Sequence, residues 1–297
     1  LLGQEKRERK KWSTQEIKRA FFSQSKKAKT VVLLAGIFGN FLLGVLCFSI
    51  IYSKIGIPTE LDYVRIVEVI KDSPAEKAGL KENDKIISID GKSIYSTSEF
   101  IELIEESKGQ EIVLQTLENE FHLMPRENPP EEEGRLGVVI TDIEMVFYPF
   151  WQMPFRGAWE GLKEAFGWSW MILQGIGLTV KQLFDGITPE VAGPVGIFQL
   201  TSSAAEQGIL QLIQFVGILS VNLAVLNFLP FPALDGGHLM FVYIGPLLGK
   251  KRREKIEHIA NTAGFIFLIS LMILVTVNDF ARLFKDSPIV SFLKSFF

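Results

Sequence analysis

Three long apolar stretches divide the polar sequence of this chain. Residues 31–51 and 209–229 are runs of 21 residues each, the first without a charge, and residues 260–277 form a third run. An apolar helix of about 20 residues can cross the hydrocarbon core of a bilayer. The first run is too long for a signal peptide and follows thirty mostly polar residues. The pattern therefore predicts three transmembrane helices.

Between the second and third runs, residues 230–248 stay apolar but contain three prolines and three glycines. Proline and glycine at that density prevent one regular helix. At membrane depth, irregular backbone persists only where it is buried in protein or lines a water-filled cavity. We therefore expect a re-entrant segment here, and a functional site within it.

The region between the first two runs alternates like a small globular domain. A turn at Asp90-Gly91 separates the predicted elements into two halves. We expect strands at 64–70 and 86–89, a helix from Ser73 to Gly79, a helix capped by Ser98 that runs to Ile104, and a hairpin of 112–117 with 121–124.

Two further segments follow this domain. Residues 125–133, with three prolines and four glutamates, are typical of a linker, and residues 134–143 are a candidate strand. Residues 158–184 are aromatic and amphipathic and include Lys163, Glu164 and Lys181. Such a pattern favours a helix lying in the membrane interface over a fourth span.

The composition agrees with this division of the chain. Of the 297 residues, 47% are apolar and 22% are charged. Both fractions fit a membrane protein when the charged residues are kept out of the apolar runs, as they are here. We expect a multi-pass α-helical membrane protein with an inserted α+β domain.

The distribution of charge predicts an orientation. Residues 1–30 hold ten Lys and Arg against three Glu, and residues 250–255 hold five against one, whereas residues 53–208 hold 13 basic and 26 acidic residues. Because cytoplasmic loops are enriched in Lys and Arg, both basic segments should be cytoplasmic. The acidic middle region should be extracytoplasmic.

Asp235 is a functional candidate on physical grounds. It stands in the Pro- and Gly-broken segment after an apolar helix, where a carboxylate is costly unless it binds something. The alternative is a solvated Asp in a cytoplasmic Asp-Gly turn.

Metal-binding residues are otherwise scarce. The single cysteine, Cys47, excludes an intramolecular disulfide and a cysteine-rich metal site. The three histidines are His122, His238 and His258; no two are four residues apart, so the chain has no H-E-x-x-H. We expect His122 to be a strand residue and His258 to face water. We therefore set aside a zinc site made of Asp235, His238 and His258 alone.

Residues 73–92, SPAEKAGLKENDKIISIDGK, resemble a PDZ domain of the bacterial protease type, and the resemblance extends over residues 63–127. Asn83 replaces the usual glycine but also tolerates a left-handed turn. The resemblance implies a peptide groove between strand 63–69 and helix 98–104, where a ligand adds as a strand. The alternative is a PDZ domain that acts as a steric filter or spacer.

Residues 227–236, NFLPFPALDG, resemble the NxxPxPxLDG motif of the site-2 protease family of intramembrane zinc metalloproteases. By that resemblance Asp235 is the third zinc ligand and Asn227 lies close to the substrate backbone. In such enzymes the zinc lowers the pKa of a bound water and a Glu acts as general base.

Further parts of the chain match the same family in order. Residues 26–40 resemble the start of the family's second span, with Ile37 in place of a proline and Asn40 facing the site. Residues 193–197, GPVGI, and 277–279, VND, match stretches near the third and fourth spans, and residues 1–3 the close of a membrane-associated β-loop. The resemblance implies that the H-E-x-x-H helix precedes Leu1. We therefore expect an N-terminally truncated protein that is inactive alone.

Two functions remain open. The first is an intramembrane zinc metalloprotease of the plasma or inner membrane that cleaves transmembrane-helix substrates, such as anti-sigma factors or signal-peptide remnants. The second is a membrane-anchored PDZ adaptor without chemistry. Membrane lipid is an expected partner and nucleic acid is not.

The chain is predicted to contain six parts in order. They are a basic segment 1–30, a span 31–52, a PDZ domain 60–128, a linker with an amphipathic helix 129–208, a span with the motif and re-entrant segment 209–248, and a span 260–280.

Overall fold

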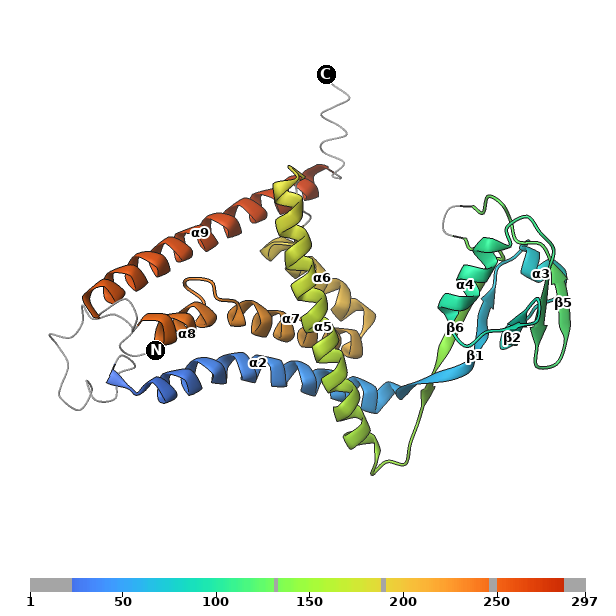
Figure 1. Cartoon of the computed structure of the whole chain (residues 1–297), viewed down its shortest axis with the longest axis horizontal. Coiled ribbons are helices and arrows are strands. Elements are labelled where there is room, and N and C mark those ends of the chain that lie inside the picture. The colour runs from blue at the N-terminus through green and yellow to red at the C-terminus, as the bar shows by residue number, and fades with distance from the viewer. Residues whose placement is uncertain (1–22, 131–132, 188–190, 246–249, 286–297) are drawn as a thin grey trace, which may run out of the picture. The chain divides into compact units, whose positions relative to one another are not determined.

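The computed structural model describes residues 23–130, 133–187, 191–245 and 250–285 (Figure 1). It divides into two compact units. Residues 55–153 form one of them, here called the sheet unit, and the described parts of residues 1–54 and 154–297 form the other, the helical unit.

The helical unit contains the long apolar helices that the sequence predicts. Its helices are α2 (Lys26–Ile55), α5 (Met153–Phe184), α6 (Pro194–Gln207), α7 (Ile209–Phe228), α8 (Asp235–Ile244) and α9 (Lys250–Lys285). Within the described residues, α2, α7 and the Lys255–Phe280 part of α9 are long and apolar enough to cross a membrane. The prediction of three such helices is confirmed.

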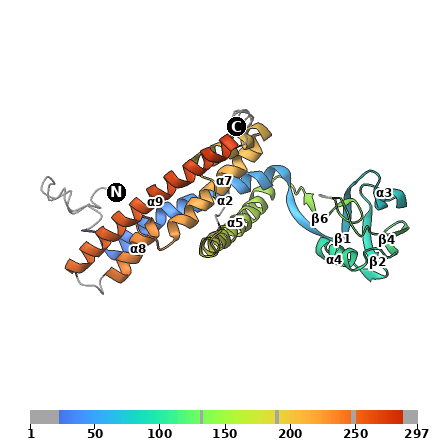
Figure 2. The same cartoon turned by 90° about the horizontal axis from the view of Figure 1, so that it is seen from above.

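Helices α2 and α7 pack closely through glycine. A Cβ placed on Gly44 would lie 2.5 Å from Cγ2 of Val221, and one on Gly217 would lie 3.0 Å from the Phe48 ring. Small residues let two apolar helices approach in this way without a polar contact. Because higher numbers on α2 meet lower numbers on α7, the two helices are antiparallel. Figures 1 and 2 show α7 and α8 lying along α2.

The predicted interfacial helix is α5, which begins at Met153 rather than at residue 158. Its first half packs on α2: a Cβ on Gly161 would lie 2.6 Å from the backbone N of Ser49. The hydroxyl of Tyr52 on α2 donates a hydrogen bond of 3.0 Å to Glu164 of α5. Helix α5 is not among the three candidate spans. Its position in the membrane interface stays a prediction.

The sheet unit is built on a sheet of six strands, ordered β5-β4-β2-β1-β6, with β3 paired to β2. The strands are β1 (Ile57–Val69), β2 (Lys85–Ile89), β3 (Lys92–Ser93), β4 (Ile112–Thr116), β5 (Glu120–Leu123) and β6 (Val138–Val146), and the helices are α3 (Pro74–Ala78) and α4 (Thr97–Glu106). Every predicted element of this region is present. The buried core joins both helices to the sheet and includes Val64, Ile66, Ile86, Phe100, Ile104, Leu114 and Leu136.

Local chemistry explains the turns and helix starts. Asn83 has φ of 69° and Asp90 has φ of 48°, so both predicted turns use left-handed backbone, which Asn and Asp tolerate best after Gly. The predicted cap Ser98 is wrong. Ser96 caps α4 instead, because its hydroxyl accepts the backbone N–H of Glu99 at 3.2 Å.

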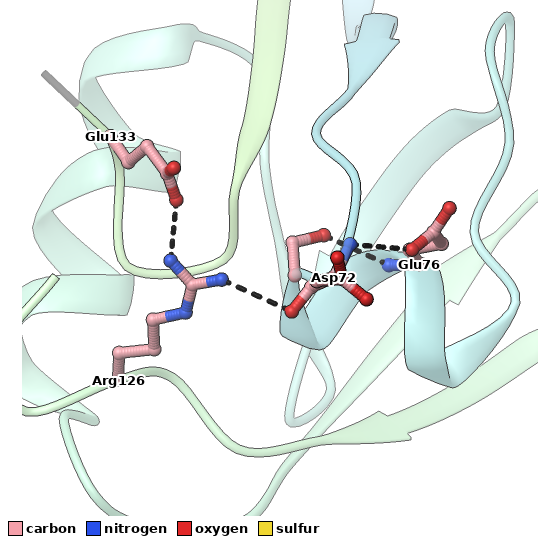
Figure 3. A network of polar contacts seen from close by, with 5 residues as sticks. Asp72, Glu76, Arg126 and Glu133 are labelled. Carbon is pink, nitrogen blue, oxygen red and sulfur yellow. Dashed lines mark hydrogen bonds and ion pairs between the residues drawn. The ribbon is translucent and has the colours of Figure 1, made fainter. Parts of the chain in front are cut away.

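The segment predicted as a linker, residues 125–133, is in part tied to the sheet unit. Pro125 is fully buried, and the backbone N of Arg126 donates to the carbonyl of Arg135 at 3.0 Å. The guanidinium of Arg126 also contacts Glu133 and the carbonyl of Asp72, beside the start of α3 (Figure 3). After this segment the chain forms β6, which pairs antiparallel with β1.

The peptide groove predicted beside strand 63–69 is wrong. That strand lies in β1, and β1 pairs with β2 on one edge and with β6 on the other, so neither edge is free for a ligand strand. Helix α4 contacts β6. Two polar bridges join them: the backbone N of Thr97 donates to Asp142 at 2.8 Å, and Arg135, just before β6, pairs with Glu105 at 2.7 Å.

Candidate functional site

The chain turns sharply between α7 and α8. Helix α7 ends at Phe228 and α8 begins at Asp235, and the six residues between them form an irregular bend. Pro230 and Pro232 lack the N–H that a continuing helix would need. Ala233 has φ of 73°, a conformation that residues other than glycine rarely adopt. The predicted break in the helix is confirmed, although residues 235–244 recover a helix of ten residues.

The two glycines after Asp235 permit this turn. A Cβ on Gly236 would lie 2.2 Å from the carbonyl oxygen of Leu229, and one on Gly237 would lie 2.1 Å from that of Phe231. Real Cβ atoms do not approach backbone that closely, so a larger residue at either position would move the bend. The two glycines are therefore required by packing, and they let the first turn of α8 lie against the end of α7.

Asp235 is the first residue of α8 and is partly buried. Its Oδ2 lies 3.8 Å from where a Cβ on Gly36 of α2 would stand. The backbone of α2 at Gly36 thus lies next to the carboxylate.

The other two predicted site residues lie on the helices beside Asp235. Asn40 is four residues after Gly36, so both lie on the same face of α2. The α2–α7 contacts of Gly44 with Val221 run antiparallel. Continued toward the start of α2, that register places the last turn of α7, with Asn227, beside the turn from Gly36 to Asn40. Both asparagines are partly buried. The three predicted site residues therefore lie on α2, α7 and the start of α8, which contact one another.

The profile of peptidase family M50 matches residues 3–271. The chain belongs to peptidase family M50.

Several curated relatives of this M50 chain are zinc metalloproteases by name. Zinc metalloprotease RasP of Geobacillus kaustophilus is 34% identical over 266 residues, which cover 90% of this chain and 62% of the relative. A putative zinc metalloprotease of Rickettsia conorii is 31% identical, covering 90% of this chain and 76% of its own length. The chain thus spans about three fifths of the RasP relative.

Among solved structures, the PDZ domain of the SdrC-like protein from Listeria monocytogenes is similar to part of this M50 chain. It is 24% identical, covers 28% of this chain and 93% of its own, and has a TM-score of 0.25.

The described residues of this M50 chain do not form a metal site by themselves. Within them, no three His, Cys, Asp or Glu side chains are grouped to hold an ion. Nδ1 of His238 lies 4.0 Å from a carboxylate oxygen of Glu257, and His258 is exposed. His122 lies on strand β5, as predicted, and its side chain is exposed. Asp235 is the one candidate ligand among the predicted site residues, and a catalytic zinc needs three protein ligands.

One buried carboxylate joins two of the matched motifs. Asp279 on α9 accepts the backbone N–H of Gly193 at 3.3 Å and of Gly196 at 3.0 Å, so it caps the start of α6. Gly193, the N-cap residue of α6, has no side chain to do so. The sequence places GPVGI and VND some 80 residues apart, and their pairing appears only in the folded chain.

Proposed function

We propose that this chain is part of an intramembrane zinc metalloprotease of the site-2 protease type, and that Asp235 is one of its zinc ligands. One observation carries the proposal: a carboxylate at a helix start lies in a Pro- and Gly-built bend between two apolar helices, against a bare glycine on a third. Membership of family M50 and the names of the relatives support it.

The proposal assigns different roles to the three predicted site residues. Asp235 contributes a hard oxygen ligand, and the 297 residues contain no H-E-x-x-H, so two histidines come from outside this sequence. Zinc, when bound, supplies an acidified water for peptide hydrolysis. Asn227 and Asn40 have neutral amides, suited to hydrogen bonds with the extended backbone of a substrate. By itself the chain is inactive.

The same proposal places the molecule in a plasma or inner membrane. Helices α2, α7 and α9 are its spans here, the basic segments 1–30 and 250–255 face the cytoplasm, and the sheet unit lies outside. Substrates are then single-span proteins, such as anti-sigma factors or signal-peptide remnants, whose helices enter between the spans.

Within that proposal the sheet unit is a PDZ domain that acts as a steric filter. The two bridges between α4 and β6, Thr97 with Asp142 and Arg135 with Glu105, support this function over peptide capture. A ligand strand would have to enter the space that these contacts span. A filter needs only bulk, and it excludes substrates whose outer domains have not been trimmed.

The decisive experiment adds an upstream helix with H-E-x-x-H from a RasP relative to this chain, purified in detergent. We expect about one zinc per protein and cleavage of a model transmembrane helix. Asp235→Ala should lose metal and cleavage together, because the site loses a ligand. Asn227→Ala should keep the metal and lose mainly turnover.

Asp185→Ala is the matched control, since Asp185 is an exposed carboxylate near the end of α5. It should change neither zinc content nor cleavage rate. Full zinc occupancy and normal cleavage in the Asp235→Ala protein would refute the ligand assignment.

A further inference from the structure

Helix α9 supports the bend that carries Asp235. In Figure 1 the bend between α7 and α8 rises toward α9. Three contacts join them in antiparallel order: the rings of Phe231 and Phe267 lie 5.7 Å apart, Gly264 faces Pro232, and Asn261 reaches Ala233. Residues 261, 264 and 267 repeat every three positions, so they form one stripe along α9.

The contact with Asn261 is the polar one. Its side-chain Oδ1 accepts the backbone N–H of Ala233 at 3.1 Å. Ala233 has φ of 73°, and a non-glycine residue remains there only when its surroundings hold it. The hydrogen bond between Asn261 and Ala233, two positions before Asp235, is a contact that can hold this conformation.

The second contact is between Gly264 and Pro232, and it depends on the absence of a side chain at Gly264. A Cβ on Gly264 would lie 2.5 Å from the carbonyl oxygen of Pro232. The backbone of α9 therefore touches the bend directly, one turn from Asn261. Thr262 and Ala263, between them in sequence, are exposed on other faces of the helix.

We propose that Asn261 is a positioning residue for Asp235: through Ala233 it holds the left-handed bend that places the Asp235 side chain against Gly36, and Gly264 provides the space for this contact. The inference rests on the proposed ligand role of Asp235 for its functional meaning. The geometry itself can be tested without zinc or cleavage.

The test measures the distance between α2 and residue 235 in this chain as it stands. With Cys47 replaced by Ala, Gly36→Cys and Asp235→Cys provide the only two thiols, because Cys47 is the single native cysteine. A Cβ at position 36 has room, since its nearest neighbour is Oδ2 of Asp235 at 3.8 Å. Oxidation of membranes with copper phenanthroline should form the 36–235 disulfide rapidly.

In that background we expect Asn261→Leu to slow disulfide formation about tenfold, the size of effect that one lost hydrogen bond to buried backbone produces. Asn261→Asp should restore the rate, because it keeps an acceptor oxygen at the same position. Thr262→Val, a polar-to-apolar change on another face of α9, should leave it unchanged. Gly264→Ala should also slow it, whereas Gly39→Ala should not, since a Cβ on Gly39 meets nothing.

A second thiol pair separates positioning from general unfolding. Phe41→Cys with Phe166→Cys reports the packing of α2 on α5, where the two rings lie 5.1 Å apart. Joined by a short bifunctional thiol reagent, this pair should react equally in all variants.

An undiminished 36–235 rate in Asn261→Leu would overturn the proposal. So would an equal loss in the 41–166 pair, or failure of Asn261→Asp to restore the rate. If the 36–235 results hold but the restored protein cleaves nothing, the positioning stands and the proposed protease function fails.

Discussion

Leu136 provides the sharpest measure of where the sheet unit ends. It lies outside the predicted boundary at residue 128, yet its side chain is 2% exposed and belongs to the core with Val64 and Phe100. Truncating a buried Leu to Ala costs about 2–5 kcal/mol, from lost apolar burial and the cavity left behind. That is a large part of the ~5–15 kcal/mol by which a domain of this size is stable.

The perturbation is Leu136→Ala in an isolated fragment of residues 55–153. We expect the midpoint of thermal unfolding to fall by about 8–40 °C, because a loss of about 2–5 kcal/mol shifts the melting temperature of such a domain by about 4–8 °C per kcal/mol. Urea unfolding followed by circular dichroism should give a matching loss of free energy. Val139→Ala is the control: Val139 lies on the neighbouring strand β6 but is 45% exposed, so its loss should stay near 0.5 kcal/mol.

A shorter fragment of residues 60–128 tests the same reasoning. Without β6 it would expose the outer edge of β1 and leave the space of Leu136 empty, so it should unfold at lower urea or remain unfolded. The reasoning fails if this fragment is as stable as residues 55–153, or if Leu136→Ala behaves like Val139→Ala.

Three other outcomes are expected. Hydrogen bonds, chiefly from the backbone N–H of Thr97 at the start of α4, lower the pKa of Asp142. The ionised Asp142 therefore stabilises the sheet unit above the unfolded pKa of about 3.9, and this stabilisation is lost as the pH falls through the folded pKa. Urea midpoints of Asp142→Asn and the parent should therefore differ at pH 7 and converge as the pH falls below the lowered pKa of Asp142. In the helical unit, Gly161→Ala should loosen α5 from α2 and speed its proteolysis, whereas Gly167→Ala should not, since only the former Cβ would meet backbone. Reporter domains fused after residues 108 and 251 should read as extracytoplasmic and cytoplasmic; the reverse pattern would contradict the charge argument.

Periodicity and turn chemistry predicted most of the elements. The apolar runs became α2, α7 and α9, because a helix of this length and apolarity needs no particular neighbour. The turns at Asn83 and Asp90 were predictable because left-handed backbone restricts residue choice locally. Ser96 was missed as the cap because Ser96 and Ser98 both precede an apolar helix, and only the geometry distinguishes them.

Asp235 was predicted as a site residue because an acidic residue beside Pro and Gly in an apolar segment is costly by itself. The sequence could not say what holds it. Asn261 follows it by 26 positions and is an ordinary polar residue at the start of an apolar run, and its hydrogen bond to Ala233 exists only because α9 packs on the bend.

The sequence alone thus determined what depends on neighbouring residues: the apolar helices, the turns, the break before α8 and the carboxylate at its start. Tertiary structure decided what depends on pairing between distant segments. It placed β6 on the edge of β1 where a peptide groove was expected, joined Asp279 to the start of α6, and brought Asn261 into a hydrogen bond with Ala233. A hydrogen bond between residues far apart leaves no spacing pattern in a single sequence, because either partner alone is compatible with many folds.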